Sequence, residues 1–159
     1  MTANPRGPGG AILKAWLIAG TMDILSAFIK FILEGKTNVE VILKYIASGL
    51  LGTSAMRGGA GTAAFGLFLH YVIALIFTVI LFFLYGKLKL IRFNPVLIGI
   101  LYGIFTWLVM NLVVVPYSKV PRPPGPFNWP QAVIAALILI VCIGLPVSLI
   151  ARKYYLYKK

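Results

Sequence analysis

Two titratable side chains, Asp23 and His70, lie inside long apolar segments of the chain. Histidine changes charge near neutral pH, and a carboxylate beside it couples the two titrations, which is the chemistry of a proton relay or a pH sensor. A lone carboxylate at the centre of a bilayer costs about 3 kcal/mol and therefore needs a partner. The alternative is purely structural, because hydrogen bonds between such side chains can simply hold helices together. Asn111 adds a third polar side chain inside an apolar segment.

Enzymatic chemistry finds little support in the sequence. The chain has one histidine and three acidic residues, and it contains no HExxH, GxSxG, Walker A or GxGxxG motif. Ser26 and Lys30 stand four residues apart, as in a Ser–Lys nucleophile pair. Lys30, however, lies close enough to the membrane edge to extend into water, and Glu34 follows it by one turn. We therefore expect no enzymatic activity, no catalytic residue, no metal and no cofactor.

The elements that hold these side chains are long apolar segments. The chain has 159 residues, of which 60% are hydrophobic and 11% charged, and its mean hydropathy is +0.96. A helix needs about 20 apolar residues to cross a hydrocarbon core about 30 Å thick. We therefore predict an all-α integral membrane protein, with residues 1–159 as a single membrane domain whose four transmembrane helices form a bundle. The four predicted spans are residues 11–33, 63–85, 95–117 and 131–151.

Residues 37–51 predict an amphipathic helix between the first and second spans. Thr37 and Glu40 fit a capping box, and Glu40 with Lys44 forms an i,i+4 pair. A segment this short and polar is expected to lie in the membrane interface, or else to pack over the end of the bundle. The apolar face is expected to carry Val39, Ile42, Leu43, Ile46 and Leu50, with Glu40, Lys44 and Ser48 on another face.

Two connections are also predicted from composition. Residues 52–61 contain several glycines and favour a flexible loop. Residues 116–130 hold six of the ten prolines, which favours an extended, non-helical connection.

Small and polar residues recur at steps of three and four along the first three spans, so each span has one face unsuited to lipid. We expect these faces to meet, with Gly20, Gly66, Gly99 and Gly103 as helix-packing residues. The fourth span is expected to close the bundle as an apolar filler, kinked at Pro146. The faces comprise Trp16, Ala19, Gly20, Asp23, Ser26, Ala27, Lys30 and Glu34; Ala63, Gly66, His70, Ala74 and Thr78; and Gly99, Gly103, Trp107 and Asn111.

The depth of the two titratable side chains can be counted along their helices. Asp23 lies about 17 Å and His70 about 19 Å from the same membrane edge, at about 1.5 Å per residue. They are therefore level, and we predict a contact between them in the bundle interior. Asn111 is expected one or two turns nearer the other edge. These three residues form the candidate intramembrane polar site.

The charge balance indicates partners and orientation. Fifteen basic against three acidic residues give a net charge of +12, and the basic residues mostly flank apolar runs. This placement favours anionic lipid headgroups as partners rather than nucleic acid. The side shared by both termini carries nine basic residues and the other side six, so we expect both termini in the cytoplasm. A homo-oligomer is a further expectation, whereas no protein partner can be named.

One part of the chain resembles a known family. The residues from His70 to Pro121 include HYVIALIFTVILFFLYGKLKL, LIGILYGIF and VVVPYSKVP, and together with IAGTMDILSAFIKFILEG they resemble the YagU-type bacterial inner-membrane proteins. The resemblance implies a multi-pass inner-membrane protein without established activity and with some association with acid tolerance. His70 matches a histidine of that family, whereas Asp23 has no counterpart there.

Two functional classes follow from these features. The first is a proton- or small-solute-handling or pH-responsive protein that uses the polar bundle interior at Asp23, His70 and Asn111. The second is a structural or partner-binding membrane subunit without transport activity.

Overall fold

The computed structural model describes residues 7–121 and 128–157, which are helical apart from short turns and contain no strand. Four helical stretches are long and apolar enough to cross a membrane, which indicates a multi-pass membrane protein. The first span is helix α1 (Pro8–Leu33) and the second is α3 (Ala60–Lys87). The third span (Pro95–Tyr117) consists of α4 (Pro95–Val109), the π-helical turn η3 (Met110–Val114) and α5 (Val115–Tyr117). The fourth span (Trp129–Tyr157) consists of α6 (Trp129–Leu139), the π-helical turn η4 (Ile140–Gly144) and α7 (Leu145–Tyr157).

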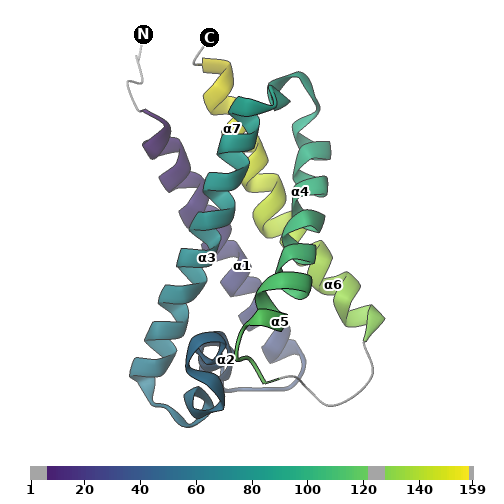
Figure 1. Ribbon diagram of the computed structural model, residues 1–159. Helices are drawn as coiled ribbons and strands as arrows, with labels where there is room; N and C mark the ends of the chain where they lie inside the picture. Colours follow the sequence, from purple (N-terminus) through teal and green to yellow (C-terminus); the bar gives the residue numbers. More distant parts are fainter. Residues whose placement is uncertain (1–6, 122–127, 158–159) are drawn as a thin grey trace.

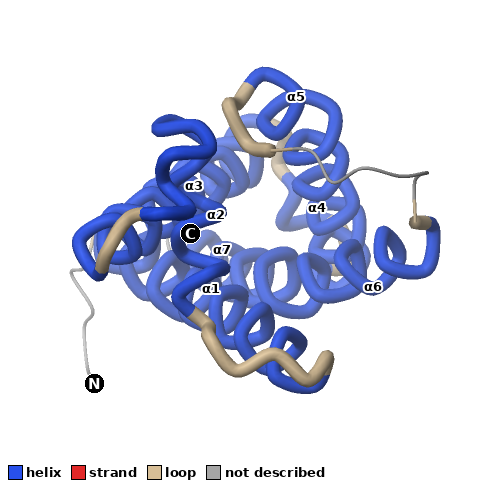
Figure 2. Tube along the Cα trace, turned by 90° about the horizontal axis from the view of Figure 1, so that it is seen from below, coloured by secondary structure: helices blue, strands red, loops and turns tan. Residues whose placement is uncertain are grey.

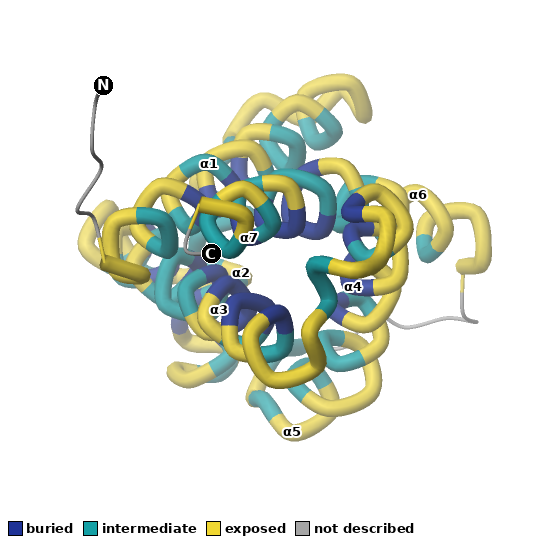
Figure 3. The backbone as a smooth tube through the Cα atoms, turned by 90° about the horizontal axis from the view of Figure 1, so that it is seen from above, coloured by how far each residue is buried: buried dark blue, intermediate teal, exposed yellow. Residues whose placement is uncertain are grey.

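The four spans lie side by side in a bundle (Figure 1). Helix α1 begins and α7 ends at one end of the bundle, while α2 (Glu40–Leu51) lies at the other. Helix α1 packs against α3 and α7, and α4 packs against η4 and α7. Buried positions gather on the inward sides of these helices (Figure 3). The core includes Ala15, Ala19, Phe77, Leu81, Tyr85, Tyr102, Ile143, Val147 and Ala151.

The outer surface of the bundle is apolar. Large aliphatic and aromatic side chains point outward from all four spans, which is the distribution expected where lipid rather than water surrounds the helices. Examples are Leu13, Leu25, Phe68, Ile76, Phe83, Leu101, Leu112, Val133 and Leu137.

Helices α4 and α6 begin where the sequence supplies a side-chain acceptor for the free N–H groups of the first turn. The Asn94 side chain accepts from the N–H of Val96 at the start of α4, and the Asn128 side chain accepts from Gln131 at the start of α6. The capping box predicted for Thr37 and Glu40 is wrong. Helix α2 begins at Glu40, whose N–H donates instead to the Asn38 side chain at 3.1 Å. The predicted pair of Glu40 with Lys44 is confirmed, at 3.1 Å.

Both predicted connections are more helical than expected. A 3₁₀ helix, η1 (Gly52–Arg57), follows α2, and α3 already begins at Ala60, so the flexible loop at 52–61 is wrong. In the proline-rich segment, Tyr117 ends the third span, and Trp129 with Pro130 begins the fourth, because proline is tolerated in the first turn of a helix. Residues 122–127 of that segment lie outside the described residues.

Helix α2 packs on the start of α3 by direct backbone contact. A Cβ atom at Gly66 would lie 1.9 Å from the carbonyl oxygen of Leu43, so only glycine permits this approach. The small residues Ala47 and Ser48 of α2 are therefore fully buried. The predicted faces were wrong at Ser48, which lies on the packed side, whereas Leu50 of the predicted apolar face is 58% exposed.

Each of the last two spans contains a wide turn just before a proline. The turn η3 precedes Pro116 and η4 precedes Pro146, and in both the N–H after the turn donates to the carbonyl five residues earlier. A proline ring clashes with the carbonyl four residues before it and cannot donate to it. The wider turn moves that carbonyl aside, so the helix continues past the proline.

The fourth span is more than the apolar filler that the sequence predicted. Gly99 and Gly103 of α4 face this span, where a Cβ at Gly103 would lie 2.4 Å from the Cα of Ile140. A Cβ at Gly144 would lie 2.0 Å from the Gly99 carbonyl oxygen. The GxxxG pair therefore makes a backbone contact within the chain, with Gly144 as its partner.

Candidate functional site

Asp23 on α1 and His70 on α3 face each other inside the bundle. The His70 Nδ1 atom lies 4.0 Å from an Asp23 carboxylate oxygen, and the two side chains are 10% and 22% exposed. The predicted contact is therefore confirmed. The second-span face that positions His70 is also as expected, because Ala63, Gly66, His70, Ala74 and Thr78 are all buried.

The hydrogen bond of the other ring nitrogen determines which nitrogen of the neutral His70 ring carries the hydrogen. The His70 Nε2 atom lies 2.8 Å from the carbonyl oxygen of Gly20, and because a carbonyl only accepts, Nε2 carries the hydrogen. In the neutral ring, Nδ1 then presents a lone pair toward the Asp23 carboxylate, and two acceptors repel each other. One proton, on either group, relieves the repulsion. The pair is thus neutral with that proton and carries one negative charge without it.

A close contact between α1 and α3 holds this geometry. A Cβ at Gly20 would lie 3.0 Å from the ring of Tyr71, so glycine brings the two helices together at the level of His70. The Trp16 indole donates to the Tyr71 carbonyl at 2.7 Å, and the hydroxyls of Thr21 and Tyr71 lie 2.8 Å apart. These bonds fix α1 against α3 within the two turns that precede Asp23.

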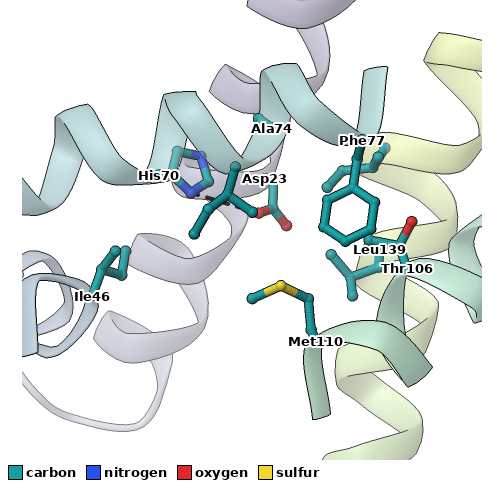
Figure 4. Close-up of a pocket in the computed structure, with 10 residues that line it drawn as sticks. Asp23, Ile46, His70, Ala74, Phe77, Thr106, Met110 and Leu139 are labelled. Carbon is teal, nitrogen blue, oxygen red and sulfur yellow. Dashed lines mark ion pairs between the residues drawn. The ribbon is translucent and has the colours of Figure 1, made fainter. Parts of the chain in front are cut away.

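A pocket of about 90 Å³ opens beside the pair. Helices α1, α2, α3, α4 and the fourth span all contribute to its wall, which is apolar apart from Asp23, His70 and Thr106 (Figure 4). The view along the bundle in Figure 2 shows how these helices surround one axis. A space of this size with polar groups on its wall can hold several water molecules. Its residues are Asp23, Ile46, His70, Ile73, Ala74, Phe77, Thr106, Met110, Leu139 and Ile143.

Asn111 does not join the site, contrary to prediction. Its side chain is exposed on the outside of the third span, where the amide donates to the Trp107 carbonyl at 2.9 Å. Residues four apart advance by about 40° on a helix of 3.6 residues per turn. In the third span this rotation carries the row off the buried face, whereas the same spacing stays buried in the second span, which packs against α1, α2 and α7. Gly99 at the start of the third-span row is buried and Asn111 at its end is not.

Two residues of the third span line the pocket where Asn111 was expected. Thr106 and Met110 stand one residue before Trp107 and Asn111, and both line the pocket. Their i,i+4 spacing is the sequence signal that could have identified them. Allowing for the rotation of about 40° per four residues moves the expected buried row from Trp107 and Asn111 to Thr106 and Met110.

Other side chains near the pair have partners of their own. The Ser26 hydroxyl donates to the Asp23 carbonyl at 2.7 Å, and Lys30 pairs with Glu34 at 3.1 Å, so Ser26 and Lys30 are engaged separately. Sequence reasoning missed Cys142 of η4, whose buried thiol lies beside Ser26 and within electrostatic reach of Asp23. Among residues 7–121 and 128–157, no three His, Cys, Asp or Glu side chains gather closely enough to hold a metal ion.

Comparison of the chain with protein-family models, curated proteins and solved structures finds no match. The resemblance to YagU-type proteins therefore stays a prediction that depends on the motifs alone.

Proposed function

We propose that this chain is a proton-handling protein of the bacterial cytoplasmic membrane, in which Asp23 and His70 bind one proton inside the bundle. The observation that carries the proposal is the orientation of the imidazole. Because Nε2 is committed to the Gly20 carbonyl, Nδ1 faces the carboxylate at 4.0 Å, and the two groups need one proton between them. The pocket gives this proton site a space for water or a small solute.

Proteoliposome flux tests the proposal. Purified protein is reconstituted with a pH-sensitive dye inside the vesicles, and proton uptake is driven by a potassium diffusion potential at external pH 5.5 and 7.5. We expect wild-type uptake to exceed that of protein-free vesicles, and Asp23→Asn and His70→Gln to abolish the excess.

Glu34→Gln is the matched control, because it removes an acid from the end of α1 outside the pocket. It should leave uptake unchanged. Uptake that persists in Asp23→Asn, or wild-type uptake no faster than in protein-free vesicles, would contradict the proposal.

The proposed topology places both termini in the cytoplasm and α2 in the outer interface. Nine basic residues on the terminal side against six on the other support this orientation, and anionic headgroups are the proposed partners of the basic residues that flank the spans. Labelling of single introduced cysteines in intact cells tests it. A cysteine at position 37 should react with a membrane-impermeant maleimide, and one at position 89 should not.

An alternative is a structural subunit that associates through the third span, as a homo-oligomer or with a protein partner. The exposed Asn111 favours it, because a polar side chain on the lipid-facing side of a span is a natural contact for a neighbouring helix. Cross-linking in membranes distinguishes the two functions. The alternative predicts a stoichiometric oligomer or complex that is lost in Asn111→Leu, together with no proton flux.

A further inference from the structure

Without the shared proton, the Asp23–His70 pair carries one negative charge. The titratable groups at the pocket are His70 on α3 and Asp23 on α1, with Cys142 of η4 close to Asp23. Helix α2 contributes Ile46 and the third span contributes Thr106 and Met110 to the wall, none of which titrates. When the shared proton leaves, the negative charge therefore stays in an apolar space, with no compensating cation among the described residues that line it. Any monovalent cation that fits could replace the proton.

The size and the wall of the pocket select the kind of cation. A cavity of about 150 Å³ accommodates benzene, with its six heavy atoms, so about 90 Å³ accommodates three or four. The wall is aliphatic and aromatic, and it includes the Phe77 ring beside Asp23 (Figure 4). An aromatic ring attracts a cation that lies over its face. A metal ion would find only two strong donors here, whereas an alkyl chain fits the apolar wall.

Two acceptors are available for an ammonium group. The Asp23 carboxylate is one, because the His70 ring with which it pairs lies 4.0 Å away, beyond hydrogen-bond distance. The other is the Thr106 hydroxyl, which donates its hydrogen to the Tyr102 carbonyl at 2.9 Å and keeps its oxygen lone pairs for accepting. Both lie on the wall of the same pocket, on different helices.

We propose that the pocket binds a small primary alkylammonium ion, of about three or four heavy atoms or fewer, in exchange for the shared proton. The ammonium donates N–H hydrogen bonds to the Asp23 carboxylate and the Thr106 hydroxyl, and its alkyl group lies against Phe77 and Met110. The proton leaves the Asp23–His70 pair for solvent, so one positive charge enters and one departs. This inference rests on the proposed function, because it requires the pair to hold one exchangeable proton.

Isothermal titration calorimetry with methylammonium chloride tests the exchange on the purified protein in detergent. The apparent affinity should rise about tenfold per pH unit while the pair is protonated before binding, as expected for one cation competing with one proton. Titration in a weakly buffered solution should release one proton per bound cation. Methylammonium and ethylammonium should bind, whereas tetraethylammonium should not fit.

Three variants sharpen the test. Asp23→Asn should abolish methylammonium binding, and Glu34→Gln should leave it unchanged. Met110→Phe takes up pocket volume and leaves both titratable side chains of the pair present, so it should abolish methylammonium binding while His70 still titrates, as followed by NMR of the ring protons. Binding that survives in Asp23→Asn or Met110→Phe, or equal binding of sodium and methylammonium, would overturn the proposal.

The two proposals fail in different ways. If His70 titrates together with Asp23 and vesicles take up protons, but methylammonium does not bind, only the amine exchange is wrong. If the titration of His70 is unchanged in Asp23→Asn and proton uptake is absent, both are wrong.

Discussion

At Gly20, where α1 meets α3, an added Cβ would lie 3.0 Å from the ring of Tyr71; at Gly103, where α4 meets the fourth span, it would lie 2.4 Å from the Cα of Ile140. The first contact is between a backbone and a side chain, and the second is between two backbones. A ring at the contact keeps the helices farther apart than a backbone contact does. His70 lies beside this looser contact, and the pocket extends from it to Thr106 and Ile143 near the tighter one. The polar pair thus lies at the looser of the two glycine contacts.

The tight contact, where Gly99 and Gly103 of α4 meet the fourth span at Gly144, should lose the most stability when a side chain there is enlarged. In Gly144→Ala the new methyl group would lie 2.0 Å from the Gly99 carbonyl oxygen, and neither backbone can move aside cheaply. We expect a loss of about 3 kcal/mol in the free energy of unfolding, the upper part of the range for overpacked interiors. Unfolding by SDS in mixed micelles measures it.

Gly9→Ala is the matched control, since nothing lies within 4 Å of a Cβ there. It should be neutral or slightly stabilising, because alanine favours helix over glycine. Equal effects of the two substitutions would show that the backbone contact at Gly144 contributes nothing.

At the polar contact between Asp23 and His70, the effects of the two substitutions on the free energy of unfolding should depend on each other, unlike at the tight contact. His70→Ala leaves the Asp23 carboxylate without its partner and the Gly20 carbonyl without its donor. We expect a loss of about 2 kcal/mol at pH 8, the cost of an unsatisfied buried polar group. The double variant Asp23→Leu/His70→Ala should lose less than His70→Ala alone, because it also removes the stranded charge. A double variant less stable than the single one would contradict this coupling.

The polar contact could be predicted from the sequence because it depends on positions along single helices. Counting depth placed Asp23 and His70 at one level, and the third span has the bounds predicted for it, 95–117. The periodicity of the second span identified its buried face, since small residues there recur without a proline to widen the helix. Each of these inferences needs only the rise and the period of a regular helix.

The neighbours across the tight contact could not be predicted in the same way. Periodicity shows which face of a helix is buried but not which helix covers it, so Gly99 and Gly103 gave no indication that Gly144 opposes them. The row that contains Asn111 also winds by about 40° per step, which carries its end to the outside. Ser48 looked like a surface residue because the packing of α2 against α3, which begins from the backbone contact between Gly66 and Leu43, leaves no mark in the sequence of α2.

A series of hydrogen bonds beside the tight contact should contribute less to the free energy of unfolding than the glycine contacts do. The Tyr85 hydroxyl lies 2.6 Å from that of Ser148, which donates to the Pro95 carbonyl at 2.7 Å, so three spans meet through one serine. Ser148→Ala should cost about 1 kcal/mol in the free energy of unfolding, typical of a hydrogen bond between membrane helices. Ser54→Ala is the control, because that exposed hydroxyl bonds only within its own turn. A loss no greater than in this control would exclude the series as a stabilising feature.

The smallest effect should come from an ion pair outside the membrane. Hydrogen bonds from Lys36 and Lys30 hold the pKa of Glu34 below its usual range. A carboxyl with a lower pKa in the folded state stabilises the fold above its unfolded pKa, and this contribution is lost as the pH falls through the folded value. Stability should therefore decline slightly on acidification below pH 5, less so in Glu34→Gln and in high salt, because water screens an exposed pair. An equal decline in Glu34→Gln would show that the Glu34 ion pair contributes nothing to the acid sensitivity.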